Sequence, residues 1–181
     1  ELGGAAVTLM NDLQATAWGV AQLGPSDFEV LQRGTPAAGN RALIAAGTGL
    51  GESLLVWDGR AWRASASEGG HADFGPRDAL EDELLHWMRA KYGRMSYERI
   101  LSGRGLADLY RFMNATGRGA EPPEFARRFA EAADPAAEVT SAALDGSCER
   151  ARLAVERFVE ICGAEAGNLA LRAFAIGGVF V

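Results

Sequence analysis

The stretch with the densest group of reactive side chains is Ser67-Glu68-Gly69-Gly70-His71-Ala72-Asp73-Phe74-Gly75-Pro76. It holds two carboxylates and one of the chain's two histidines, which are groups that bind polar ligands and transfer protons. Adjacent glycines free the backbone and a proline closes the stretch, so we expect a loop. Loops held by a scaffold on both sides often carry binding and catalytic groups. A surface turn with solvated charges is the alternative, and this stretch alone leaves both interpretations open.

A second polar group, Asn11-Asp12, follows an apolar stretch over residues 5–10 that predicts a short strand. Apolar residues at helical spacing continue through Leu23, so the order is strand, polar pair, helix. Asn and Asp accept hydrogen bonds from the free N–H groups at a helix start, which favours an N-terminal cap. Open α/β folds also place functional side chains where a strand ends, and the two roles are compatible.

A glycine-rich run, Gly47-Thr48-Gly49-Leu50-Gly51, joins two predicted strands over residues 42–46 and 53–57. Dinucleotide-binding and P-loop motifs instead join a strand to a helix, and this run also lacks the Gly-Lys-Ser/Thr ending of a P-loop. We therefore interpret it as a tight hairpin whose N–H groups and Thr48 hydroxyl could hold an anion such as a phosphate. A plain glycine turn is the alternative.

The elements that must position these groups combine strands and helices, as in an α/β fold. Asp58-Gly59 predicts a hairpin turn before a third strand over residues 61–67. Other patterns predict a short strand over residues 28–31, a connection over 34–40, helices over 76–91, 97–101, 105–115, 123–132, 135–144 and 147–163, a helical continuation over 168–173, and a strand over 175–181. His86 lies in the first of these helices, where we expect a structural or surface role.

The chain has 181 residues, 48% of them hydrophobic and 23% charged, with a net charge of −6. This composition is typical of a globular protein. No basic cluster indicates nucleic-acid binding, and no apolar run is long enough to span a bilayer. We therefore expect neither a nucleic acid nor a membrane as a partner. Cys148 and Cys162 lack metal-ligand spacing and form no disulfide framework, so we expect no metal held by these cysteines and favour a reducing compartment. The chain begins without Met and stops within an apolar stretch, so we expect it to be part of a longer protein.

The two polar groups and the glycine-rich run occur in a fixed order with two further motifs. These are Glu98-Arg99-Ile100-Leu101-Ser102-Gly103-Arg104-Gly105-Leu106 and Gly167-Asn168-Leu169-Ala170-Leu171. The ordered set resembles bacterial glucokinase, the ATP-dependent sugar kinase of the actin/hexokinase-like fold, across essentially the whole chain. The resemblance rests mainly on Glu-Gly-Gly-His-x-Asp-Phe followed by Glu-Arg-x-Leu-Ser-Gly at this spacing. It implies an α/β, ribonuclease H-like, two-lobed sugar kinase that is incomplete in this chain.

The resemblance also implies roles for individual residues at a glucose site. Asp12 matches the catalytic base, and Asn11 matches a ligand of the sugar hydroxyls. Glu68 and His71 match the sugar-binding loop, and Glu98 matches a further hydroxyl ligand. Sugar hydroxyls both donate and accept hydrogen bonds, so converging carboxylates, an amide and an imidazole suit a hexose.

For the phosphoryl donor, the resemblance assigns Gly47, Thr48 and Gly49 to the second phosphate-binding turn, with ATP and Mg²⁺ as cofactors. The family's first phosphate loop, Asp-x-Gly-Gly-Thr, is missing, and Gly3-Gly4 is no substitute. The adenosine loop is missing as well, and Gly177-Gly178 precede the strand after which it should occur. We therefore expect the 181-residue chain alone to be inactive, or nearly so. The resemblance further implies a cytoplasmic homodimer.

The expected mechanism uses two lobes. Residues 1–40 would belong to the small lobe with Asp12, and residues 41–181 to the large lobe with the phosphate hairpin, the sugar loop and the helices. Closure about residues 34–40 would bring Asp12 to the 6-hydroxyl of glucose and exclude water. A hexose sensor of the same fold is the alternative function, and it could lose Asp12. A nucleotide-binding oxidoreductase is a third hypothesis, which would need a helix directly after Gly51. Hexose breadth and the choice between ATP, ADP and polyphosphate as donor stay open.

Overall fold

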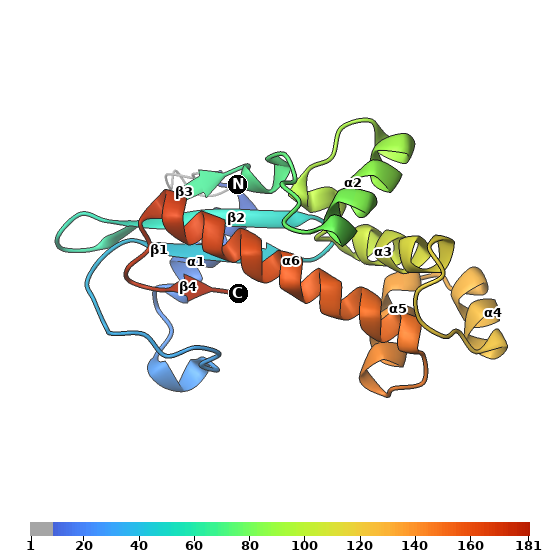
Figure 1. Cartoon of the computed structure of the whole chain (residues 1–181). Helices are drawn as coiled ribbons and strands as arrows, with labels where there is room; N and C mark the ends of the chain where they lie inside the picture. The colour runs from blue at the N-terminus through green and yellow to red at the C-terminus, as the bar shows by residue number, and fades with distance from the viewer. Residues whose placement is uncertain (1–8) are drawn as a thin grey trace, which may run out of the picture. The chain divides into compact units, whose positions relative to one another are not determined.

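The computed structural model describes residues 9–181, which form two compact units. The first unit contains the described residues up to 45 together with 52–67 and 168–181, and the second contains 46–51 and 68–167. Figure 1 labels the helices and strands. The elements are α1 (Asp12–Val20), β1 (Arg41–Ala46), β2 (Leu50–Trp57), β3 (Trp62–Ser67), α2 (Ala79–Tyr92), α3 (Gly103–Ala115), α4 (Pro123–Glu131), α5 (Pro135–Leu144), α6 (Glu149–Ala173) and β4 (Val179–Phe180), with 3₁₀ turns η1 (Pro25–Asp27), η2 (Gly69–His71) and η3 (Tyr97–Arg99).

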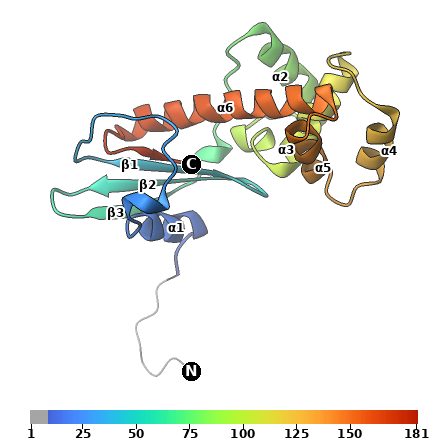
Figure 2. The ribbon, with the colours of Figure 1, turned by 90° about the horizontal axis from the view of Figure 1, so that it is seen from below.

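The first unit is built on a sheet with the strand order β3-β2-β1-β4. The predicted hairpin is confirmed, since β2 and β3 pair antiparallel and the Asp58 carboxylate accepts hydrogen bonds from the N–H groups of Arg60 and Ala61. Helix α1 lies against one face of this sheet (Figure 2). A small core of Ala17, Leu43 and Leu55 seals that contact. The glycine run therefore follows a buried strand, as the sequence predicts.

The second unit is mainly helical, and α3 lies at its centre between α2 and α5. One face of α3 is buried almost completely, because apolar residues recur every three or four positions along it. The core side chains include Leu84, Met88, Ile100, Leu109, Tyr110, Phe112, Met113, Phe125, Val139 and Ala142. This helical core is the support on which the loops of the second unit rest.

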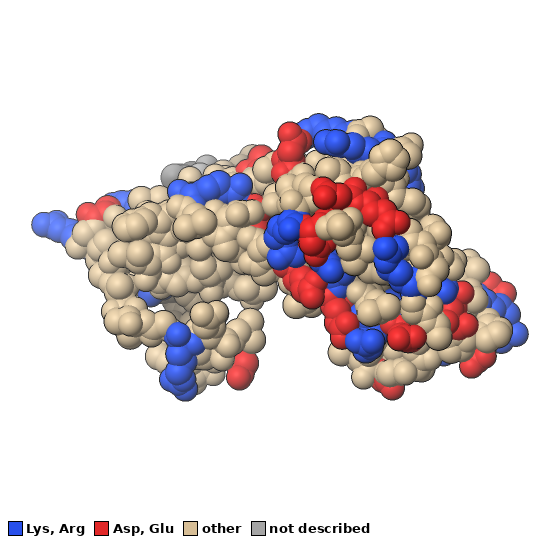
Figure 3. Space-filling model, in the orientation of Figure 1, with Lys and Arg blue, Asp and Glu red and all other residues tan. Residues whose placement is uncertain are grey.

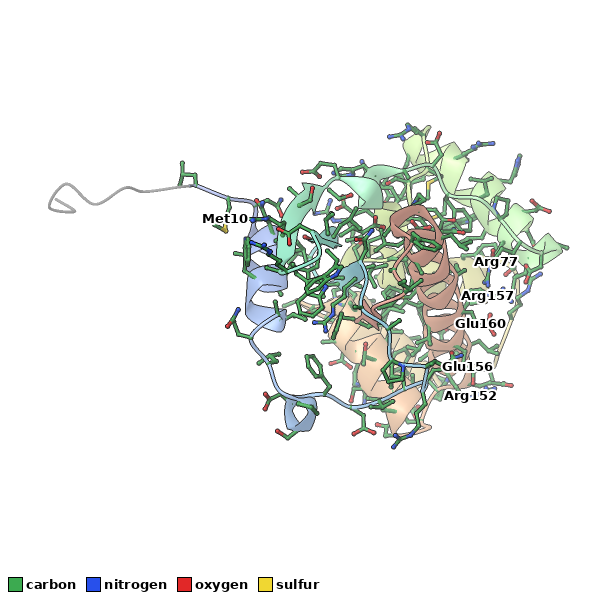
Figure 4. The ribbon with its side chains drawn as sticks, turned by 90° about the vertical axis from the view of Figure 1, so that its left-hand side faces the viewer. Met10, Arg77, Arg152, Glu156, Arg157 and Glu160 are labelled. Carbon is green, nitrogen blue, oxygen red and sulfur yellow. The ribbon has the colours of Figure 1, made fainter. Side chains whose placement is uncertain are left out.

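Ion pairs join α2 to the part of α6 that lies in the second unit. The guanidinium of Arg157 contacts the carboxylates of Asp78, at 2.7 Å, and of the fully buried Glu81, at 3.0 Å. Figure 4 labels Arg157, Glu160, Glu156 and Arg152, which belong to α6, and Arg77, which precedes α2. Acidic and basic side chains alternate over this part of the surface in Figure 3, so the visible face carries no extended basic patch.

Several predicted elements differ from the structure. The strand predicted over residues 28–31 is wrong: this segment is irregular, because β-propensity alone forms no strand without a pairing partner. The last strand is shortened to Val179–Phe180, since residues 175–178 form turns and Gly178 has φ +123°. Helix α6 begins at Glu149 rather than Ser147 and continues to Ala173 without a break.

The segment predicted as a helix over residues 97–101 forms only the 3₁₀ turn η3. Most of the strand predicted over residues 5–10 lies outside the described part of the chain. Within the described part, every helix is too short or too polar to cross a lipid bilayer.

Candidate functional site

The loop that holds Glu68 and His71 lies in the second unit, where backbone hydrogen bonds fix it beside η3. The N–H of Tyr97 donates to the carbonyl of Ala72, and the N–H of Phe74 donates to the carbonyl of Met95. The ring of Phe74 is buried edge-on against that of Tyr97, with centroids 5.5 Å apart. The loop is thus a short, anchored segment that contains the 3₁₀ turn η2.

Three of the predicted site residues converge at this loop. His71 lies between two carboxylates, with its Nε2 3.7 Å from Glu68 Oε2 and its Nδ1 3.6 Å from Glu98 Oε1. The side chains of Glu68 and His71 are 78% and 56% exposed, so both can reach a ligand, while that of Glu98 is 33% exposed. The arrangement offers a ligand both acceptors and an imidazole that can donate or accept.

Glu98 also links this cluster to the glycine run. Its second oxygen, Oε2, accepts a hydrogen bond of 3.1 Å from the N–H of Leu50. A Cβ at position 49 would lie 2.6 Å from the same oxygen, so a larger residue there would push the Glu98 side chain away from the turn. The N–H of Gly103 donates to the carbonyl of Gly47, at 2.9 Å, and holds the other side of the turn. The predicted phosphate turn and the predicted sugar cluster are therefore neighbours within one unit.

Close packing also explains the glycine at position 70. A Cβ at Gly70 would lie 2.2 Å from the carbonyl oxygen of Leu50, a backbone atom that cannot move aside. Gly70 is buried against the start of β2. The glycine thus brings the Glu68–His71 segment directly onto the strand that follows the phosphate turn.

A pocket of about 170 Å³ opens beside this junction. Its lining residues, all in the second unit, are Thr48, Tyr92, Glu98, Arg99, Ser102 and Arg104. Sequence reasoning identified Thr48 and Glu98 but missed Tyr92, Ser102 and the two arginines. Arg99, Ser102 and Arg104 lie inside the Glu98–Leu106 motif, which points to this part of the chain without distinguishing the arginines, and Tyr92 lies outside the motif.

One wall of the pocket is held by a buried carboxylate. The hydroxyl of Tyr92 donates to Asp108, which also binds Lys91 and Arg111 and is only 1% exposed. Burial by itself raises the pKa of the Asp108 carboxyl, but hydrogen bonds from Lys91, Tyr92 and Arg111 outweigh it and hold that pKa below its ordinary value. Asp108 is therefore ionised in the folded protein at neutral pH and contributes to its stability.

We expect Asp108→Asn to lower the free energy of unfolding by about 1–3 kcal/mol at neutral pH, because charge-assisted hydrogen bonds are lost. The folded pKa is depressed, so this contribution is present above the unfolded value of about 3.9 and is lost as pH falls through the folded value. Urea unfolding at about pH 7 and about pH 3 should show the difference between wild type and variant shrinking in acid. Asp82→Asn, an exposed carboxylate on α2, is the control and should change little. A difference that stays constant with pH would contradict this account.

Asn11 and Asp12 lie in the first unit, at the start of α1. The predicted cap is confirmed: Asn11 Oδ1 accepts hydrogen bonds from the N–H groups of Leu13, at 2.9 Å, and Gln14, at 3.2 Å. Asp12 occupies the first helical position, and its side chain is exposed. The Asp12 Oδ1 also accepts a hydrogen bond of 2.8 Å from the N–H of Leu13, but Asn11 accepts from that same N–H, so α1 keeps its cap without the Asp12 carboxylate.

Comparison with known proteins adds an independent finding. A family model described as glucokinase matches residues 1–181. A glucokinase of Synechocystis sp. is 40% identical in an alignment of 195 residues that covers 100% of this chain and 55% of that protein. A glucokinase of Chromobacterium violaceum is 39% identical, over 99% of this chain and 49% of that protein. The chain thus spans about half the length of these curated relatives.

Solved structures agree with this similarity. The crystal structure of a glucokinase from an Antarctic psychrotroph superimposes with a TM-score of 0.77 at 30% identity, covering 94% of this chain and 50% of that one. A glucokinase from Balamuthia mandrillaris, solved in complex with glucose, gives a TM-score of 0.63 at 24% identity and supports the fold alone. The fold class predicted from the sequence, an α/β sugar kinase, is confirmed.

Proposed function

The chain belongs to the glucokinase family, and we propose that the whole protein transfers a phosphoryl group from ATP to the 6-hydroxyl of glucose. The observation that carries the proposal is the convergence of Glu68, His71 and Glu98 beside the glycine turn. A sugar cluster that adjoins a phosphate turn within one unit is the arrangement that transfer between them requires. The described part of the chain would supply most of the sugar site and one phosphate turn.

We propose that the three side chains hold the sugar hydroxyls. Glu68 and Glu98 would accept hydrogen bonds from hydroxyl groups, and His71 would donate or accept between them. A site built for hydroxyls rejects analogues that lack them, because its polar groups would otherwise lose their partners. Asn11 would add an amide, through donors that its capping role leaves free, since the cap uses only Oδ1.

Asp12 is the proposed catalytic base. Phosphoryl transfer depends on positioning and charge stabilisation, and a carboxylate within hydrogen-bond reach can take the proton of the attacking hydroxyl. In this proposal, residues 1–40 form the small lobe, residues 41–181 form the large lobe, and residues 34–40 form the hinge. The irregular structure of residues 34–40 is compatible with that role. Closure would bring Asp12 to glucose and exclude water that would otherwise consume ATP.

For the phosphoryl donor, we propose that Gly47, Thr48 and Gly49 contact the phosphates of ATP. Mg²⁺ would neutralise charge on those phosphates, as it does in other phosphoryl transfers. Among residues 9–181, no three His, Cys, Asp or Glu side chains gather into a metal site. A cytoplasmic homodimer is part of the same proposal, as is the inactivity of the 181-residue chain alone.

The chain's two histidines give a matched test of the sugar site. We expect His71→Ala in the whole protein to weaken glucose binding by about tenfold or more, because a hydrogen-bonding group between two carboxylates is removed. His86→Ala, on the exposed face of α2, should bind glucose as the wild type does. Calorimetric titration of glucose, mannose and fructose into each protein measures both the effect and the hexose breadth. Equal glucose affinity in the two variants would reject the proposed site.

A further inference from the structure

We propose that Arg99 and Arg104 form a binding site for a phosphate group in the pocket beside Thr48. The inference rests on the proposed function and deepens it, because it adds two positively charged residues to a phosphate turn that otherwise offers only N–H groups and a hydroxyl. A phosphate oxygen accepts hydrogen bonds from guanidinium N–H groups in the planar, two-point geometry that arginine favours.

The two arginines differ from most others in the second unit because neither is paired with a carboxylate among residues 9–181. Among the described residues, neither guanidinium forms an ion pair or donates a hydrogen bond to another residue. The arginines of this unit that do form ion pairs are Arg77, Arg94, Arg111, Arg118, Arg128, Arg150, Arg152 and Arg157. Two unpaired cations facing one small pocket, in a chain with a net charge of −6, indicate a site for an anion.

Contacts with neighbouring side chains fix the residues that line the pocket. The guanidinium of Arg99 lies over the ring of Tyr92, 4.8 Å from its centroid, and such stacking leaves the N–H groups at its edge free for a ligand. Tyr92 is fixed in turn by its hydrogen bond to the buried Asp108. Arg104 follows Ser102, whose buried hydroxyl accepts a hydrogen bond from the N–H of Gly105 and sets the start of α3.

One carboxylate, Glu98, shares the pocket and opposes the two positive charges. Its Oε2 accepts a hydrogen bond from the N–H of Leu50 and its Oε1 lies 3.6 Å from His71, so one negative charge stands against the two positive charges of the arginines. The pocket therefore keeps an excess of positive charge. Glu98 also places the pocket at the junction of the sugar cluster and the phosphate turn. A phosphate held here would be the group that passes from donor to sugar.

The size of the pocket limits what it can hold. Its volume of about 170 Å³ is below the range of about 300–1,000 Å³ that is usual for drug-sized ligands. It accommodates a phosphate group with bound water rather than a complete nucleotide. The phosphate could belong to the terminal part of the donor or to the sugar phosphate product, and both have the same chemistry.

The test is calorimetric titration of two probes, inorganic tripolyphosphate and glucose 6-phosphate, into the whole protein. The variants are Arg99→Met and Arg104→Met, which keep an apolar stem but remove the charge. Arg127→Met is the matched control, because Arg127 is exposed on α4 and also lies outside the ion pairs of the described residues. Glucose is titrated into all four proteins to confirm that the sugar site is intact.

We expect each pocket variant to weaken binding of at least one anion by about tenfold or more, with Arg127→Met close to wild type. A larger loss for tripolyphosphate assigns the site to the donor, and a larger loss for glucose 6-phosphate assigns it to the product. Anion affinities that match those of Arg127→Met for both probes would overturn the proposal. If the wild type binds neither glucose nor its phosphate, the proposed function fails separately, while the tripolyphosphate titration still tests the pocket.

Discussion

Replacing Asp12 with Asn in the whole protein is expected to lower kcat for glucose phosphorylation by about 10²–10⁴-fold, the usual contribution of a general base. The asparagine has almost the same shape and can still hydrogen-bond the 6-hydroxyl, so glucose affinity should change little. It cannot take the proton, however, and the attacking oxygen would stay a poor nucleophile. Because Asn11 rather than Asp12 caps α1, the fold should tolerate the change.

The control for this variant is Glu29→Gln, which removes an exposed carboxylate from the same unit. A coupled assay gives kcat, and calorimetry gives glucose affinity for both proteins. Loss of a first-turn carboxylate costs about 0.3–1 kcal/mol of helix stability, so thermal unfolding should be recorded beside the kinetics. Full turnover in Asp12→Asn would mean that the carboxylate serves only the helix start.

Gly70→Ala is expected to have the second largest effect. Its Cβ would lie 2.2 Å from the carbonyl oxygen of Leu50, so either the loop or the start of β2 must move. A shift of the loop displaces Glu68 and His71 from Glu98 and disturbs the turn before Leu50. We expect glucose binding to weaken by about tenfold or more, together with about 1–3 kcal/mol of lost stability, as overpacked sites usually show.

Gly75→Ala is the matched control in the same loop. A Cβ there would meet only the hydroxyl of Tyr97, at 3.8 Å, which is an ordinary contact. Glucose titration and urea unfolding of the two variants separate close packing from general loop sensitivity. Wild-type affinity in Gly70→Ala would show that the loop does not need its approach to β2.

The sequence was most informative where local chemistry decides the structure. The Asn11 cap, the Asp58-Gly59 hairpin and the strand that enters the glycine run follow from hydrogen bonding and turn geometry within a few residues. Elements that depend on distant partners were less predictable. Residues 28–31 have strand-like composition but no strand to pair with, although Phe28 places its ring 5.2 Å from that of Phe180.

The same distinction applies to the candidate site. On local grounds Glu98 is a first-turn carboxylate, and only the folded unit shows it bound to the N–H of Leu50, 48 positions away. Nothing in the local sequence distinguishes Arg99 and Arg104 from arginines that form surface ion pairs. Their difference lies in the shared pocket and in having no ion-pair partner among the described residues, which are properties of packing.

The most direct test of the central claim is to follow ATP and glucose by ³¹P NMR in the presence of the whole protein. The account predicts that a glucose 6-phosphate resonance grows as the terminal phosphate resonance of ATP declines, and that no such conversion occurs with the 181-residue chain alone. If the whole protein binds glucose but never forms a sugar phosphate from ATP, the claim that it is a glucose kinase is contradicted.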